Sequence, residues 1–485
     1  MPSHWMPRLL VLIAGVFMTT VDIIFVSVAT PIIQVDLSTG SEAISWVSTA
    51  YTLTLCVVAP SSLWMLRKVG LKRLYILCLL GYVIGAALCG LASSVEMLVA
   101  SRIVQAVPGA LIGAVSIPII LQLVPRKWVG PAIGAYALCL MASPVVGPSL
   151  GGYMAEYLDW RLIFLVNVPI GLLTAVAAFF LLPSLPEGEA GRFDVLGFLT
   201  AGIGLAALLL GLTKLPDWQW STYELQVLFI VSAVSLTLFV VIELEVDNPL
   251  LDLRVFGYRV FATSMLLLGI LFIELSTGLI YNLQFLQSVQ GLGQFDAGRV
   301  LLPQIWMLIV VVPVAVVSLG RLGPRWPVVI GLSTLAFGTY QLHEINFDTP
   351  RHVVAVLLVI RSAGIGLALL PTIVAGAMAL PPGKTPMVGA MVNIIRLVVG
   401  PIGAAGFTAL LTRVQAQNLN DRIGLITDAG PAAGGAPSFA MKTAYYLQLQ
   451  GRALAFAIGE QFLLLSALAA VGAVLALRLG SKSPR

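Results

Sequence analysis

Two acidic residues lie deep inside long apolar segments, where an ionised carboxylate is costly. Asp22 stands about 20 Å into the first segment at 1.5 Å per helical residue, and Glu274 lies within a later one. A carboxyl group at such depth either pairs permanently or exchanges protons. Arg102, in the fourth segment, is the expected partner of Asp22, because a buried arginine costs at least ~2.5–3.5 kcal/mol. These residues predict proton coupling, with a fixed structural ion pair as the alternative.

Other chemistry finds little support in the chain. The run 383–385 (Gly-Lys-Thr) is similar to the end of a phosphate loop, but that motif needs glycine where Met378 stands. The three histidines lack metal-ligand spacing, and the four cysteines fall inside apolar runs, which favours core positions. The sequence therefore predicts no enzyme activity, no cofactor and no metal.

The composition indicates what holds these side chains in place. Of the 485 residues, 59% are hydrophobic and 10% are charged, against about 25% charged in a typical soluble domain. This excludes a soluble enzyme, a nucleic-acid-binding protein and a disordered chain. We expect an all-α polytopic protein in a lipid bilayer, with about fourteen spans near 9–33, 44–66, 74–95, 97–123, 130–155, 161–182, 194–214, 223–243, 260–287, 297–319, 326–342, 352–380, 386–412 and 457–479.

The distribution of basic residues predicts the orientation of these spans. Lysine and arginine concentrate in one set of short loops and in the tails, so the net charge of +5 indicates positive-inside topology rather than an anionic macromolecular partner. Both termini are expected in the cytoplasm. The chain is thus predicted to be a multi-pass protein of a bacterial cytoplasmic (inner) membrane.

A weak internal repeat predicts the domain organisation. The sequence Val-Val-Gly-Pro at 145–148 recurs 253 positions later, and Gly70, Gly113 and Pro118 recur at the same offset. Two homologous six-helix halves are expected at 1–185 and 256–485, the second with a long outer loop at 414–451. Residues 186–255 then form two additional spans and a linker, which account for the long offset.

Two glycine-containing motifs predict how the helices move. After the second span, Gly70 forms a tight turn between Arg67 and Arg73, which either gates motion at the cytoplasmic side or serves only as positive-inside anchoring. The fifth span contains a motif of small residues and a proline, which permit close helix packing and bending. Its residues are Gly147, Pro148, Gly151 and Gly152.

Together these motifs resemble the fourteen-span drug:proton antiporter branch of the major facilitator superfamily. The resemblance covers nearly the whole chain. It is carried by residues 22–31, by Trp46, Tyr51, Leu53, Pro60 and Trp64, by the Gly-Pro-x-x-Gly-Gly motif, by Asp159-Trp160-Arg161 with Asn167, Pro169 and Gly171, by residues 248–256 and 284–303, and by Gly389, Asn393, Arg396 and Gly400.

The resemblance implies a major facilitator fold and proton-coupled export of small amphipathic or cationic compounds by alternating access. Export of an endogenous metabolite or siderophore is the first alternative, and a non-transporting receptor or scaffold is the second. The implied partners are protons, a small-molecule substrate and, in the envelope, a periplasmic adaptor with an outer-membrane channel. Candidates for lining the substrate site are Phe25, Tyr51, Gln105, Tyr281, Gln284, Trp306 and Asn393.

The chain departs from the family pattern at several positions. The cytoplasmic loop motif has Leu63 where glycine is usual and Arg67 where aspartate is usual, which removes the charge-pair switch built on that aspartate. The fourth-span motif has Ala106 and Pro108 in place of two glycines. The resemblance therefore does not identify the substrate.

Overall fold

The computed structural model describes residues 5–125, 128–183, 191–215, 218, 222–381, 384, 386–428 and 439–480. The regular structure of these residues is entirely helical. Among them, twelve helices are long and apolar enough to cross a membrane, and Val129–Ser143 with Val145–Tyr157 forms a bent pair that makes a thirteenth. The expected short span is α14 (Arg325–Gln341), 17 residues long, which packs on α15 and α18.

The N-terminal half contains six spans among the described residues, if the bent pair of α6 is taken as one. Its first and second helices pack around the fourth and fifth, which brings α1, α5 and α6 together in the interior. The elements are α1 (Trp5–Asp36), α2 (Ser41–Val58) continued by η1 (Ala59–Ser61) and α3 (Ser62–Val69), α4 (Leu71–Gly90), α5 (Val95–Leu123), α6 (Val129–Tyr157), α7 (Leu162–Leu165) and α8 (Asn167–Leu181).

The C-terminal half repeats this arrangement. Two of its spans contain a wide π-helical turn, at Phe285–Val289 and at Ile395–Val399. Its elements are α11 (Arg259–Gln284) with η4 (Phe285–Val289), α12 (Gln294–Leu301), α13 (Pro303–Leu322), α14, η5 (Leu342–Glu344), α15 (Arg351–Met378), α16 (Pro386–Ile394) with η7 (Ile395–Val399), α17 (Gly400–Asp428) and α18 (Phe439–Ala476).

Two turns reflect the repeat in backbone geometry. Gly70 joins α3 to α4 with φ 81°, and Gly323 ends α13 with φ 71°. A residue with a Cβ is strained at such φ values, so both positions suit glycine. The two residues stand 253 positions apart, as the sequence repeat requires.

The two extra helices pack beside the seam between the halves. α9 (Val195–Lys214) contacts α2 of the first half and α17 of the second, whereas α10 (Tyr223–Glu245) packs chiefly on α9. η3 (Leu253–Gly257) follows, and Asp252 before it forms a hydrogen bond that raises the pKa of Lys384. This contact ties the segment after α10 to the loop before α16.

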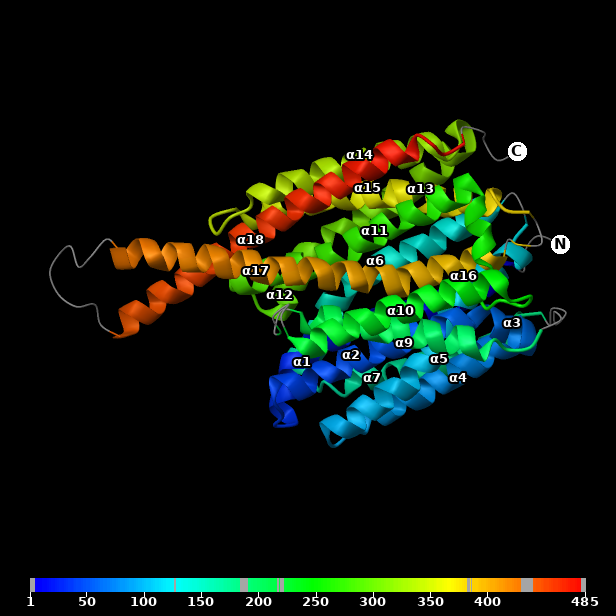
Figure 1. The fold of residues 1–485 in the computed structure, drawn as a ribbon, viewed down its shortest axis with the longest axis horizontal. Coiled ribbons are helices and arrows are strands. Elements are labelled where there is room, and N and C mark those ends of the chain that lie inside the picture. Colours follow the sequence, from blue (N-terminus) through cyan, green and yellow to red (C-terminus); the bar gives the residue numbers. More distant parts are fainter. Residues whose placement is uncertain are drawn as a thin grey trace.

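The expected long loop at 414–451 is largely helical. α17 continues to Asp428 and α18 begins at Phe439, and both extend beyond the other helices, at the end of the bundle opposite the two chain termini (Figure 1). Glycine and proline concentrate between these helices, at 429–438, which lies outside the described residues. The flanking segments contain no proline and only one glycine each, Gly424 and Gly451, so helix continues through them.

Candidate functional site

A buried polar network surrounds Asp22 in the N-terminal half. Arg102 Nη1 on α5 donates to Asp22 Oδ2 at 2.5 Å, and both side chains are almost fully buried. Asn167 Nδ2, at the start of α8, donates to Asp22 Oδ1 at 3.1 Å, and Gln105 Nε2 donates to the same oxygen at 3.4 Å. The predicted partnership of Asp22 with Arg102 is therefore present, and both carboxylate oxygens are engaged.

Aromatic rings enclose the arginine of this network. The guanidinium carbon of Arg102 lies 3.7 Å from the ring centre of Tyr51 on α2 and 5.5 Å from that of Phe164. Arg102 Nη1 also donates to Gln105 Oε1 at 2.7 Å. Cation–π contacts and charge-assisted hydrogen bonds offset part of the cost of burying the charge. The network thus joins α1, α2, α5, α7 and α8 around one buried carboxyl group.

Small residues let α6 approach α1 beside this network. A Cβ atom on Gly147 would lie 2.8 Å from Ile24 Cβ, and one on Gly151 would lie 2.8 Å from Phe25 Cδ1. The side chain of Phe25 therefore packs into the contact between α1 and α6. α6 bends by 43° between Ser143 and Val145, close to this contact. Gly147 and Gly151 therefore serve close packing of α6 on α1, whereas the bend lies just before the motif.

A second acid–arginine pair occupies the equivalent helices of the C-terminal half. Arg361 Nη2 on α15 lies 3.0 Å from Glu274 Oε2 on α11 and also donates to the backbone carbonyl of Glu274. Both side chains are buried. A Cβ atom on Gly278 would lie 2.4 Å from the guanidinium carbon of Arg361, so the bare glycine makes room for it. First and fourth helices are thus joined in each half.

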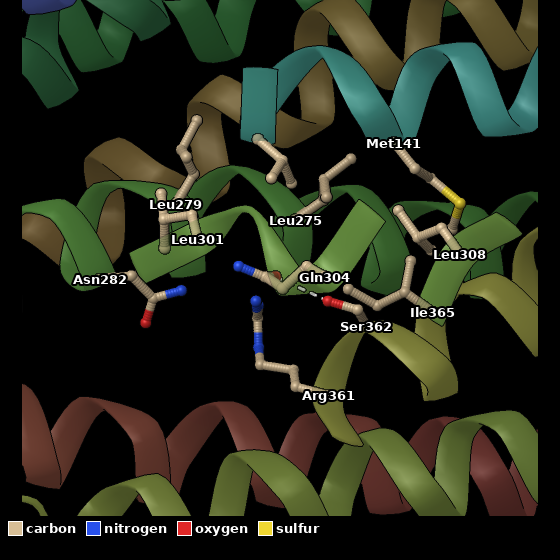
Figure 2. A pocket seen from close by; sticks show the side chains of 11 residues that line it. Met141, Leu275, Leu279, Asn282, Leu301, Gln304, Leu308, Arg361, Ser362 and Ile365 are labelled. Atoms are coloured by element: carbon tan, nitrogen blue, oxygen red, sulfur yellow. Dashed lines mark hydrogen bonds between the residues drawn. The ribbon is translucent and has the colours of Figure 1, made fainter. Parts of the chain in front are cut away.

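A small cavity of about 30 Å³ lies beside Arg361, where α6 of the N-terminal half faces the C-terminal half. Figure 2 shows Asn282, Gln304, Arg361 and Ser362 on its polar side, with Ser362 Oγ donating to Gln304 Oε1 at 2.6 Å. Such a volume holds one or two water molecules. Its remaining lining is apolar and comes from Met141, Val145, Leu275, Leu279, Leu301, Leu308 and Ile365.

Besides the two ion pairs, each of which lies within one half, a group of hydrogen bonds joins the two halves directly. Asn393 Nδ2 on α16 donates to the carbonyl of Ala110 on α5 at 2.9 Å, and Arg396 Nη1 donates to Thr20 Oγ1 on α1 at 3.2 Å. Cys56 Sγ donates to the carbonyl of Leu397 at 3.0 Å. The predicted lining residue Asn393 therefore holds the two halves together here.

The other predicted lining residues do not join these networks. Tyr281 is buried within the C-terminal half with its ring centre 5.9 Å from that of Phe462. Gln284, half-buried, ends α11. Trp306 on α13 is 72% exposed and faces away from the interior. Helix rotation cannot be read from span boundaries alone, which explains why these three were expected at the interface.

Several interior polar residues were not predicted as site residues. Asn167 appeared only in the family signature, Arg361 only as a charge at membrane depth, and Gln304 and Ser362 did not stand out in the sequence. An arginine at membrane depth is a usable signal. Single amides and hydroxyls in apolar helices are common and give no such signal.

Comparisons with known proteins agree with the fold and the motifs. Residues 10–404 match the family model of the Major Facilitator Superfamily. The uncharacterised MFS-type transporter YhcA of Bacillus subtilis is 30% identical over 84% of this chain and 76% of its own, and the multidrug resistance protein Stp of Mycobacterium tuberculosis is 29% identical over 83% and 76%. The tetracenomycin C resistance and export protein of Streptomyces glaucescens is 25% identical over 76% and 68%.

Solved structures support the same architecture. A D-xylose–proton symporter superposes with a TM-score of 0.62 at 13% identity, covering 98% of each chain. A bacterial homologue of the human lysosomal transporter Spinster superposes with a TM-score of 0.56 at 16% identity, covering 97% of each. At this identity the likeness concerns the fold alone. From its matched length, its motifs and its two repeated halves, the chain belongs to the Major Facilitator Superfamily of membrane transporters.

Proposed function

We propose that this transporter is a proton-coupled exporter of small amphipathic compounds. The observation that carries the proposal is the network around Asp22, in which a buried acid is held by Arg102, Gln105 and Asn167 from two other helices. A buried carboxylate whose negative charge is balanced by a cation and hydrogen bonds in one arrangement, but not in another, has a different proton affinity in the two. The names of the relatives, which include multidrug resistance and export proteins, support export as the direction.

The coupling step follows from this geometry. With Asp22 bonded to Arg102, the pair is neutral overall and the proton is absent. Movement that parts α1 from α5 leaves the carboxylate uncompensated at depth and favours uptake of a proton, which water on the outer side supplies. Return to the paired arrangement on the cytoplasmic side releases the proton. Export is linked to this cycle because α5 packs on α16 of the other half and Thr20 on α1 accepts a hydrogen bond from Arg396.

The proposal includes a location and an orientation. The protein lies in a bacterial cytoplasmic membrane with both termini inside, as the basic loops predict. α17 and α18 then extend to the outer side, where a periplasmic adaptor and an outer-membrane channel would meet the protein. An endogenous metabolite or siderophore is the alternative cargo, which a substrate panel distinguishes.

Transport into everted membrane vesicles tests the function. A panel of dyes, antibiotics and siderophores is offered to vesicles with an acidic lumen, with and without an uncoupler. We expect uptake of amphipathic compounds that stops when the uncoupler collapses the gradient, and no uptake into vesicles that lack the protein. Uptake that persists at full rate without a gradient contradicts proton coupling. A panel in which no compound enters contradicts export.

A further inference from the structure

Arg396 lies near mid-membrane, where the two halves meet. It stands ten residues beyond the start of the α16 span, about 15 Å along the helix. Its guanidinium donates from Nη1 to Thr20 Oγ1 of the opposite half at 3.2 Å and from Nη2 to Asn393 Oδ1 at 3.0 Å. Its Nε atom is buried without a hydrogen-bond partner among the described residues.

The surrounding backbone is shaped to admit this side chain. Arg396 belongs to the π-helical turn Ile395–Val399, and such turns often occur at functional positions. On the opposite half, Gly113 of α5 faces it directly. A Cβ atom there would lie 2.9 Å from Arg396 Nη2 and closer still to Asn393 Oδ1. A bare glycine and a widened helical turn thus bring a cation to the seam between the halves.

The charges of the membrane interior do not cancel. Asp22 is neutralised by Arg102, and Glu274 is neutralised by Arg361. Within the described interior, Arg396 contacts only an alcohol and an amide, and no ion pair compensates its charge. Glu243 is also buried, but it lies two residues from the end of α10, where it accepts a hydrogen bond from Leu251 N. The middle of the spans therefore carries one net positive charge among the described residues, which rises further if either acid is protonated. An uncompensated cation at this depth is costly, so its presence favours a function.

We propose that Arg396 binds an anionic group of the transported compound, such as a carboxylate, phenolate or sulfonate. A planar guanidinium binds such a group through two parallel hydrogen bonds, which replace its bonds to Thr20 and Asn393. This inference rests on the proposed export function and narrows its substrate class. The class expected from the sequence was amphipathic or cationic, whereas the interior charge favours amphipathic anions.

Anion export has an electrical consequence that cation export lacks. An anion that leaves in exchange for an entering proton moves two positive charge equivalents inward. The inside-negative membrane potential then drives the exchange in addition to the proton gradient. Exchange of one monovalent cation for one proton moves no net charge. The dependence on membrane potential therefore separates the two substrate classes.

Two dyes with the same ring system give a matched test. Fluorescein is an anion and rhodamine 123 is a cation, and both consist of a three-ring xanthene with a phenyl substituent. Binding to the purified full chain is measured by fluorescence anisotropy, and uptake is measured in everted vesicles. The variants are Arg396→Gln, which removes the charge, and Arg396→Lys, which keeps it. Folding of each variant is checked by gel filtration and thermal unfolding.

We expect the unaltered chain to prefer fluorescein, and Arg396→Gln to lower the anion-to-cation binding ratio by about tenfold or more. Arg396→Lys should retain most of that preference. Equal binding of the two dyes, preference for rhodamine 123, or binding of neither overturns the anionic class, even where other compounds are exported. Preferential binding of fluorescein without gradient-driven uptake supports the anionic class and contradicts the proposed function.

Discussion

Asp22 and Glu274 are both buried carboxylates with an arginine partner, yet their surroundings differ. Asp22 receives hydrogen bonds on both oxygens from three side chains, whereas Glu274 Oε1 has no partner among the described residues. The sequence predicts the first pair, because an acid as deep as Asp22 needs a compensating charge and Arg102 is an arginine at membrane depth in the same half. Asn167 could not be predicted as its third partner, because that contact depends on how α8 packs against α1.

At the residue scale, Gly278 is predicted to be essential for the second ion pair. Gly278→Ala places a methyl group where the Arg361 guanidinium lies and separates it from Glu274. Breaking a buried pair costs about 3–5 kcal/mol, so the unfolding midpoint of the purified protein should fall clearly.

Gly269→Ala, on the same helix, is the matched control. A Cβ atom at Gly269 meets only Val399 Cγ1, at an ordinary contact distance of 3.5 Å. Its unfolding midpoint should equal or slightly exceed that of the unaltered chain, since alanine favours helix. Equal midpoints for the two alanine variants contradict the proposed role of Gly278.

Among the elements, α9 lies between two surfaces, on α2 and on α17, that the proposed alternating access moves relative to one another. Its contact with α2 is close. A Cβ atom on Gly202 would lie only 3.1 Å from Val57 Cγ1, and Lys214 Nζ forms an ion pair with Glu42 Oε1 at 2.8 Å. Its contact with α17 borders an open pocket of about 310 Å³ that is lined by residues of α2, α9, α11 and α17. α9 is therefore expected to stay with the N-terminal half.

Disulfide cross-linking tests which contact of α9 slides. In a chain whose four native cysteines are replaced by alanine, the pair Gly202→Cys with Val57→Cys links α9 to α2 and should leave export intact. The pair Leu209→Cys with Val398→Cys, two residues of one buried cluster, links α9 to the C-terminal half. It should stop export until a reductant is added. Inhibition by the first pair alone would show that α9 moves with the other half.

The helices themselves were largely predictable. Each expected span has a helix in the structure, because a run of about 20 apolar residues has few other ways to satisfy its backbone in a bilayer. For the outer segment 414–451 the sequence leaves two alternatives open, a short amphipathic hairpin formed by its flanks or a disordered loop. In the structure the flanks at 414–428 and 439–451 are helical, as continuations of α17 and α18. The π-helical turns at η4 and η7 were not expected, because tertiary contacts rather than local sequence select them.

For the whole molecule, the proposed direction of transport depends on which side of the membrane each end of the helix bundle faces. Lys68, Gly480 and Gln417 are exposed positions near opposite ends of the bundle. Single cysteines at 68 and 480 should react with a membrane-impermeant maleimide only after cells are opened. A cysteine at 417 should react in intact cells. Reaction of all three in intact cells, or of 417 only in opened cells, contradicts the orientation derived from the basic loops.

In the proposed mechanism, the contact between the two halves lets one acid control the whole cycle. Hydrogen bonds from Asn393 and Arg396 join the two halves in the present arrangement. Arg396 donates to Thr20 on α1, the same helix that holds Asp22 in its bond to Arg102. A change of charge at Asp22 therefore acts on a helix that takes part in closing the seam. We propose that breaking and remaking these contacts converts a local proton exchange into a rearrangement of the halves.

The most direct test of proton coupling compares two acids on α1. Asp22→Asn removes the buried titrating group but keeps its shape, whereas Asp36→Asn alters an acid at the exposed end of the same helix, bonded to Trp160 and Arg161. Purified variants are reconstituted in vesicles, a pH gradient is imposed, and substrate-dependent proton flux is recorded. We predict that Asp22→Asn abolishes gradient-driven export while Asp36→Asn exports at the parental rate. Export by Asp22→Asn at the parental rate, with the same pH dependence, would contradict the account and transfer the coupling role to Glu274.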